Sequence, residues 1–155
     1  MAGTIEARLK ELGIVLPTPA VPVAAYVPYT RSGNTVYVSG QLPFRDGVLT
    51  HTGKVGTEIP VEDAQLCARQ CALNILAQVK AACDGDLDRV ARCLKLGGFV
   101  ACGPEFTDQP KVINGASELM HQIFGDAGKH ARFAVGAPSL PLGAAVEVEA
   151  IFELT

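Results

Sequence analysis

The sequence has no tryptophan, and charged residues make up only 19% of its 155 positions. No apolar run approaches the roughly 20 residues that a membrane-spanning helix needs. Lys and Arg form no block, and the net charge of −3 argues against a nucleic-acid backbone as a standing partner. The opening stretch MAGTIEARLKELG mixes charged and apolar residues and does not resemble a secretory signal. These absences favour a cytoplasmic protein with neither a membrane nor a nucleic acid as partner.

The sequence does contain enough apolar residues to fold as one domain. Hydrophobic residues make up 48% of the chain, and its length allows a sizeable core. We therefore predict a single domain over residues 1–155, in which residues 1–23 form an N-terminal helix and a proline-rich arm. Thr4 is the expected cap of that helix, which should end at Gly13.

Five cysteines are present, an odd number, and none forms a CxxC pair. Cys67 and Cys71 lie one helical turn apart, a spacing that a metal site can use. No histidine lies near them in sequence, and Ala, Leu and Val crowd the same segment. The pattern favours buried thiols over a metal site or disulfides. Neither a metal nor an organic cofactor is implied.

The hydrophobic periodicity predicts an α+β fold, with a mixed sheet that carries helices on one face. A long helix should begin after Pro60, where Glu62 and Asp63 suit the first turn. Its expected apolar face is Leu66, Leu73, Leu76, Val79 and Cys83. The other expected elements are a helix at Gln109–Phe124 and strands at Ala24–Thr30, Thr35–Ser39, Val90–Cys102 (interrupted at Gly97 and Gly98), Arg132–Val135 and Ala145–Leu154.

The last strand alternates strictly, with Val146, Val148, Ala150, Phe152 and Leu154 on one face and three glutamates on the other. Glu149 and Glu153 fit a solvated face. Glu147 differs because Arg132 lies fifteen residues upstream, across the turn PSLPLG. If the two strands are adjacent and antiparallel, the pair shares one pocket, in which Arg grips a carboxylate and Glu moves a proton. A structural salt bridge explains the spacing equally well.

Three segments carry a resemblance to a known family. AYVPYTRSGNTVYVSGQLP and HARFAVGAPSLPLGAAVEVEAI resemble the two signature regions of the Rid/YjgF family, and KVINGASELMHQIFGDAGKHAR resembles its second helix. The resemblance runs over residues 24–154 and is ungapped around the arginine and the xExEAI strand. It implies a chorismate-mutase-like fold with two main helices on one face of the sheet. It also implies a homotrimer with sites in the clefts between subunits.

The resemblance further implies an enzyme, a deaminase that hydrolyses reactive enamines and imines such as 2-aminoacrylate to 2-keto acids and ammonia. Arg132 would hold the substrate carboxylate and Glu147 would position water. The substrate-binding candidates are Tyr26, Ser39, Gly40, Asn114 and Ala134, with backbone contacts at Gly40 and Ala134. Many deaminases have Cys at the position of Ala134, so thiol chemistry there is excluded. The N-terminal arm is typical of a longer subgroup without an assigned role.

Other functions stay open at this point. The same cleft would serve a binding protein that holds small carboxylates, such as 2-keto acids, without turnover. The endoribonuclease label of the family is a weaker alternative, because the chain lacks a basic patch and neither His121 nor His130 has an evident partner. Chorismate mutase activity rests on fold analogy alone.

Overall fold

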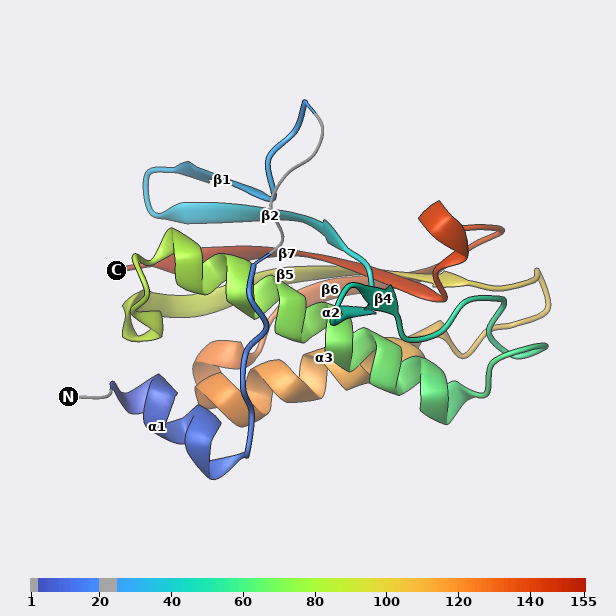
Figure 1. Cartoon of the computed structure of the whole chain (residues 1–155), viewed down its shortest axis with the longest axis horizontal. Helices are drawn as coiled ribbons and strands as arrows, with labels where there is room; N and C mark the ends of the chain where they lie inside the picture. Colours follow the sequence, from blue (N-terminus) through green and yellow to red (C-terminus); the bar gives the residue numbers. More distant parts are fainter. Residues whose placement is uncertain (1–2, 20–24) are drawn as a thin grey trace.

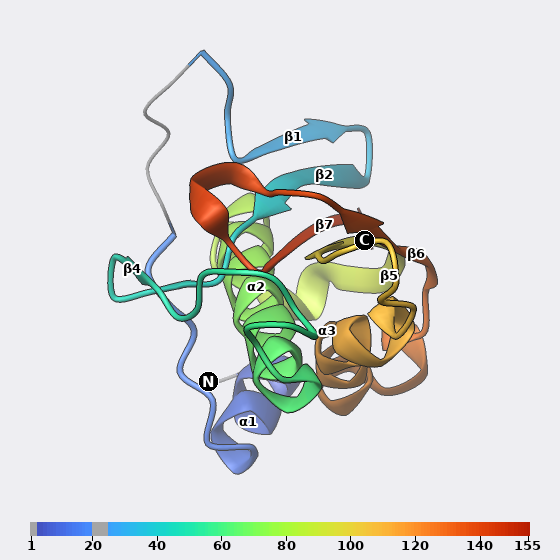
Figure 2. The same cartoon turned by 90° about the vertical axis from the view of Figure 1, so that its right-hand side faces the viewer.

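The structure, a computed structural model, describes residues 3–19 and 25–155. A five-stranded sheet forms one layer, and the three α-helices of the described residues form the other, on one face of the sheet (Figures 1 and 2). The helices are α1 (Thr4–Glu11), α2 (Val61–Ala82) and α3 (Gln109–Phe124), with 3-10 turns η1 (Leu87–Arg89), η2 (Gly125–Gly128) and η3 (Pro141–Gly143). The strands are β1 (Tyr29–Ser32), β2 (Thr35–Gln41), β3 (Phe44–Arg45), β4 (Val48–Leu49), β5 (Val90–Ala101), β6 (Ala131–Ala137) and β7 (Val146–Leu154).

The strand order in the large sheet is β1-β2-β7-β5-β6, and β3 and β4 form a separate hairpin. Only β5 and β6 among these neighbours run parallel, and α3 connects them. The sheet is therefore mixed, and the α+β prediction with two main helices on one face is confirmed. In the described part of the chain, no helix is both long and apolar enough to cross a membrane.

The core lies between the sheet and α2 and α3. The alternating residues of β7 that were expected to share a face are all at most 2% exposed. On α2 the prediction of the apolar face is wrong at Leu66, which is 60% exposed. The buried face is built instead on Ala64, Cys67, Ala68 and Cys71. Small side chains let α2 approach its neighbours closely, which the leucine spacing alone does not reveal.

All five cysteines are free thiols buried in the fold, as the core interpretation expects. Helix α3 has the predicted bounds, and α2 begins directly after Pro60. Strand β5 is not interrupted at Gly97 and Gly98. A Cβ at Gly98 would lie 2.6 Å from Ile113, so this glycine serves close packing of α3 on the strand.

The N-terminal helix is held by a residue far along the chain. Thr4 does not cap α1, because the cap position is Gly3, which has no side chain. The Asp88 carboxylate instead accepts from the backbone N–H of Thr4 at 2.9 Å and of Ile5 at 2.8 Å. Leu9 is 3% exposed, so α1 packs as part of the domain. Residues 20–24 of the proline-rich arm, and with them Pro22 and Ala24, lie outside the described residues.

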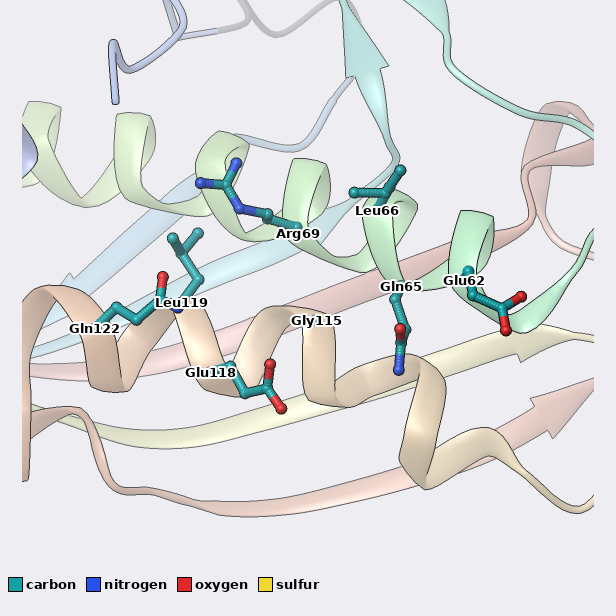
Figure 3. Close-up of a pocket in the computed structure, with 8 residues that line it drawn as sticks. All are labelled: Glu62, Gln65, Leu66, Arg69, Gly115, Glu118, Leu119 and Gln122. Atoms are coloured by element: carbon teal, nitrogen blue, oxygen red, sulfur yellow. The ribbon is translucent and has the colours of Figure 1, made fainter. Parts of the chain in front are cut away.

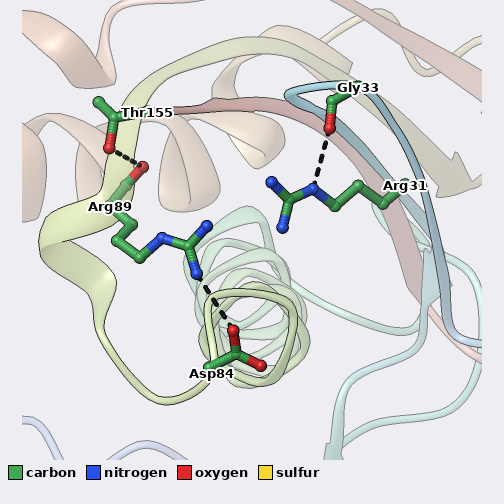
Figure 4. A network of polar contacts seen from close by, with 5 residues as sticks. All are labelled: Arg31, Gly33, Asp84, Arg89 and Thr155. Carbon is green, nitrogen blue, oxygen red and sulfur yellow. Dashed lines mark hydrogen bonds and ion pairs between the residues drawn. The ribbon is translucent and has the colours of Figure 1, made fainter.

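The first strand begins later than expected, at Tyr29, and the hairpin loop is the pair Gly33 and Asn34. Val36 and Val38 of β2 face the core. The C-terminus is tied to the end of the helix layer, where the Thr155 hydroxyl donates to the Arg89 carbonyl at 3.3 Å (Figure 4). The Arg89 guanidinium also pairs with Asp84 at 3.2 Å.

Candidate functional site

The two residues expected to carry the chemistry do not meet within one chain. Strand β5 lies between β6, which carries Arg132, and β7, which carries Glu147. The prediction that these strands are adjacent is therefore wrong. Arg132 is in register with Leu96, and Leu96 with Ala150, three residues from Glu147. Two strand spacings and three residues of rise separate the two Cα atoms by about 14 Å.

Arg132 and Glu147 also lie on opposite faces of the sheet. Arg132 shares the face of its register partner Leu96, which is fully buried under the helices. Glu147 is opposite Phe99, one of the residues that alternate away from the core. A direct salt bridge between the two side chains of one chain is excluded by this arrangement. We therefore treat each residue as the centre of a separate candidate half-site.

The first half-site is the Arg132 guanidinium held against α3. Its Nη1 donates to the Asn114 side-chain oxygen at 2.9 Å and to the Ser117 hydroxyl at 3.0 Å. Its Nη2 donates to the Pro110 carbonyl at 3.2 Å. Asn114 and Ser117 are three residues apart and therefore lie on one face of the helix. The structure thus brings together two of the predicted site residues, Arg132 and Asn114.

The fixed guanidinium keeps donors for a ligand. Arginine has five N–H groups, and partners within residues 3–19 and 25–155 accept from three of them. An N–H on Nε and one on Nη2 remain. Because β6 is an edge strand and Arg132 is only half-buried, these donors are available to a small anion. A carboxylate is suited to two such parallel bonds.

Ser117 and His130 extend this half-site and were not predicted as parts of it. The His130 Nδ1 lies 2.7 Å from the Gly128 carbonyl, which can only accept, so Nδ1 carries the proton. In the neutral ring Nε2 then accepts from the Ser117 hydroxyl at 2.9 Å. A directed chain runs from Arg132 through Ser117 to His130. The signal for Ser117 was its spacing from Asn114 on α3.

The second half-site is Glu147 beside Gly40. A Cβ on Gly40 would collide with the Glu147 carboxylate, so the glycine makes room for it. Burial raises the pKa of Glu147, and the nearby charge of Glu149 raises it further. The raised pKa lets this carboxyl exchange a proton nearer to neutral pH than an ordinary glutamate does. Two more candidates, Gly40 and Glu147, are thus neighbours.

Of the remaining candidates, Ser39 and Ala134 lie within two residues of a half-site on the same strand, whereas Tyr26 lies in the segment before β1. Ser39 precedes Gly40 at an irregularity in the pairing of β2 with β7, and its hydroxyl donates to the Val27 carbonyl at 2.8 Å. The Tyr26 side chain is 66% exposed. Ala134 lies two residues beyond Arg132 on the same face of β6, opposite Gly98.

A thiol, an imidazole and a carboxylate line up elsewhere, near the start of α2. Cys67 Sγ lies 3.3 Å from His51 Nδ1, and His51 Nε2 lies 3.9 Å from Asp63. Cys67 is fully buried, and burial raises the pKa of its thiol. A buried thiol held in its neutral form is a poor nucleophile. We therefore assign Cys67 to the core and give this row no catalytic role.

A groove of about 200 Å³ runs between α2 and α3 on the outer side of the helix layer. Figure 3 shows Glu62, Arg69 and Glu118 along it. A Cβ at Gly115 of α3 would collide with the Gln65 carbonyl of α2, so the two helices are in close contact there. None of the predicted site residues lines this groove. The candidate site therefore lies along the sheet.

Comparison with known proteins agrees with this class of α+β fold. A family model described as "YjgF/chorismate_mutase-like, putative endoribonuclease" matches residues 6–154. The chain belongs to this YjgF/chorismate-mutase-like family, and the resemblance noted in the sequence is confirmed. Protein TCP17 from Trypanosoma cruzi is 49% identical over 99% of this chain and 96% of its own length.

Two further similarities cover most of the chain. A 2-iminobutanoate/2-iminopropanoate deaminase from Dermatophagoides farinae is 30% identical over 89% of this chain and 92% of its own. The crystal structure of Atu1372 from Agrobacterium tumefaciens, a protein of unknown function, has a TM-score of 0.91 and 55% identity, covering 97% of this chain and 92% of that one. The family and the fold are thus established, and the reaction has to be argued from the site.

Proposed function

We propose that this protein hydrolyses reactive enamine or imine acids, such as 2-aminoacrylate, to 2-keto acids and ammonia. Water adds to C2 of the imine, the C–N bond breaks, and ammonia leaves with the carbonyl compound as the second product. Such a reaction needs a grip on the carboxylate and a base for the water. The single observation that carries the proposal is the Arg132 guanidinium, fixed by three hydrogen bonds with two N–H groups left for a carboxylate.

Glu147 is the proposed base. Its pKa is raised mainly by burial, so its carboxylate takes a proton from water more readily than an ordinary glutamate. The absent side chain at Gly40 lets this carboxylate pack directly against β2. A similar protein, the deaminase from Dermatophagoides farinae, has the proposed chemistry in its name, which supports the assignment.

The site needs two copies of the chain, because Arg132 and Glu147 lie on opposite faces of one sheet. We propose that it forms where the β6 edge of one copy meets the open sheet face of the next, in a homotrimer. That open face is partly apolar. Tyr37 is 48% and Val135 42% exposed, and the rings of Phe99 and Phe133 pack with centroids 5.2 Å apart. An exposed apolar face of this kind is typical of an interface.

RNA cleavage is less well supported. It usually needs a free general acid and base, whereas both ring nitrogens of His130 are hydrogen-bonded, to Ser117 and to the Gly128 carbonyl. The net charge of −3 gives no electrostatic attraction for a phosphate backbone. A small carboxylate therefore fits the guanidinium better than RNA does.

The test is an assay in which a pyridoxal-phosphate enzyme generates 2-aminoacrylate and the release of pyruvate is followed. Wild type should accelerate that release, and Arg132→Ala should lose the acceleration while the assembly stays intact by size-exclusion chromatography. Arg69→Ala is the matched control, because Arg69 is also half-buried but lies on α2 in the outer groove. An unchanged rate in Arg132→Ala would refute the proposal. Binding of 2-keto acids by wild type without any acceleration would select a binding protein.

A further inference from the structure

A second cavity, of about 360 Å³, opens where β5 and β6 end and α3 begins. This volume falls within the range of about 300–1,000 Å³ that is typical of small-molecule sites. Its wall has no charged side chain and is formed mainly by Cys102, Pro104, Phe106, Gln109, Gly136 and Pro138. The Gln109 amide is held by the Phe106 carbonyl at 2.9 Å, so the wall is preorganised. None of these residues was predicted from the sequence.

The cavity lies next to the Arg132 half-site. Arg132, Ala134 and Gly136 alternate along β6 and share one face, in register with Leu96, Gly98 and Val100. Same-face neighbours on a strand are about 6.5–7 Å apart. Arg132 also donates to the carbonyl of Pro110, the residue directly after Gln109. The carboxylate grip and the cavity therefore share the first turn of α3.

Strand β6 sets the direction in which a bound substrate lies. In the pose that we consider, a 2-imino acid with its carboxylate on Arg132 lies along β6, with C2 one bond from the carboxylate carbon and directed toward Ala134. Its side chain then continues along β6 toward Gly136 and the cavity. The uncharged wall suits an uncharged side chain, because a buried charge without a partner is costly.

Gly136 lets the wall of this cavity pack closely. A Cβ there would lie 2.8 Å from Cys102 Sγ and 3.0 Å from the Gln109 side-chain nitrogen. Any side chain at position 136 therefore displaces Cys102 or Gln109 and reshapes the cavity. The φ angle of Gly136 is not positive, so a substitution there changes volume without backbone strain.

We propose that this cavity is the side-chain subsite of the deaminase and that it selects 2-imino acids with an uncharged side chain longer than a methyl group. Gly136 is the residue that sets this specificity. The inference rests on the proposed function, because it uses Arg132 as the carboxylate grip. It goes beyond that function by naming the substrate class.

The test compares imines generated in place by an amino-acid oxidase from leucine and from alanine, with the remaining imine trapped by semicarbazide. Wild type should show a kcat/KM for the leucine-derived imine about tenfold or more above that for the alanine-derived one, since each added methylene in a fitting pocket contributes up to that order. Gly136→Val should reduce this ratio about tenfold. Leu66→Ala, in the outer groove, should leave the ratio unchanged.

Binding of 4-methyl-2-oxopentanoate and of pyruvate, measured by calorimetry, separates this inference from the proposed function. If wild type hydrolyses no imine but binds the longer keto acid more tightly, and Gly136→Val abolishes that preference, the reaction is wrong and the subsite holds. If wild type prefers alanine-derived imine, or Gly136→Val leaves both ratios unchanged, the subsite is refuted. Cys102→Ala, which enlarges the same cavity, should raise the preference for long side chains and covers the case in which Gly136→Val fails to fold.

Discussion

Two inactive variants should restore activity to each other if the site spans two copies of the chain. The perturbation is co-expression of Arg132→Ala with Glu147→Gln, each with a different affinity tag. Arg132 and Glu147 lie on opposite faces of the sheet with β5 between their strands. A copy with an intact Arg132 must therefore meet a copy with an intact Glu147. Tandem purification on both tags isolates the mixed assemblies.

The expected activity follows from the symmetry. In a cyclic trimer that contains both variants, about one of the three sites combines an intact Arg132 with an intact Glu147, whichever variant is in excess. Mixed trimers should therefore have about one third of the wild-type activity. A mixed dimer would have about one half. The measured fraction thus reports the number of subunits as well as the arrangement of the site.

The residual activity of each single variant must be low for the activity of the mixed assemblies to be measured. Loss of two hydrogen bonds to a charged group, at about 1.5–3 kcal/mol each, should cost Arg132→Ala about 3–6 kcal/mol of transition-state binding. That loss lowers kcat/KM by a factor of about 10²–10⁴. Loss of a general base costs Glu147→Gln about 10²–10⁴ as well. One third of the wild-type activity lies far above either background.

The assay is imine hydrolysis per mole of assembly, with two differently tagged copies of Arg132→Ala as the control. That control should stay at background. Mixed assemblies that are intact by size but no more active than the control would refute the arrangement. The site would then have to lie within one chain, in conflict with the strand order.

Two further predictions concern the groups around this pair. Burial and then the charge of Glu149 raise the pKa of Glu147, so the base form of Glu147 predominates only above that raised pKa. Glu149→Gln should lower the pKa of Glu147 and therefore move the acidic limb of the kcat/KM profile to lower pH. An acidic limb that stays in place or moves to higher pH contradicts the role of Glu149. Ser117→Ala removes one of the hydrogen bonds that orient the Arg132 guanidinium. Because one such hydrogen bond contributes about 1 kcal/mol, KM should rise about fivefold, with kcat less affected. Ser117→Thr keeps the hydroxyl and should restore KM, whereas an equal fall of kcat in both variants would refute a positioning role.

Much of the fold was predictable because it follows from local periodicity. Helix α3 has the predicted bounds, and every predicted inward residue of β7 is buried. The wrong predictions concern positions where contacts with residues distant in the sequence decide the structure. Thr4 is a good capping residue by type, but the Asp88 carboxylate occupies that role from across the chain. Leu66 fits the helical period and yet faces out, because small residues form the packed face of α2.

In the candidate site, too, local sequence patterns predicted some features while long-range contacts decided others. The side chains that hold Arg132 come from α3, and the sequence already indicated Asn114. What the sequence could not give is the position of β5, which enters between two strands that follow one another in the chain. Strand order depends on long-range pairing and not on local pattern. For the same reason, the sequence did not indicate that His51 contacts Cys67, sixteen residues away.

Glycines illustrate why geometry was needed to interpret the site. Gly33 and Gly47 have positive φ angles of 58° and 80° and belong to tight turns, which is the usual reason for glycine there. Gly40 and Gly136 are not among the residues with positive φ. Conformational freedom therefore does not explain them, and the space that they leave does. The Glu147 carboxylate packs against Gly40, and Cys102 and Gln109 pack against Gly136 at the cavity beyond Arg132. In the proposed two-copy site the substrate would lie between these two glycines, one from each copy of the protein.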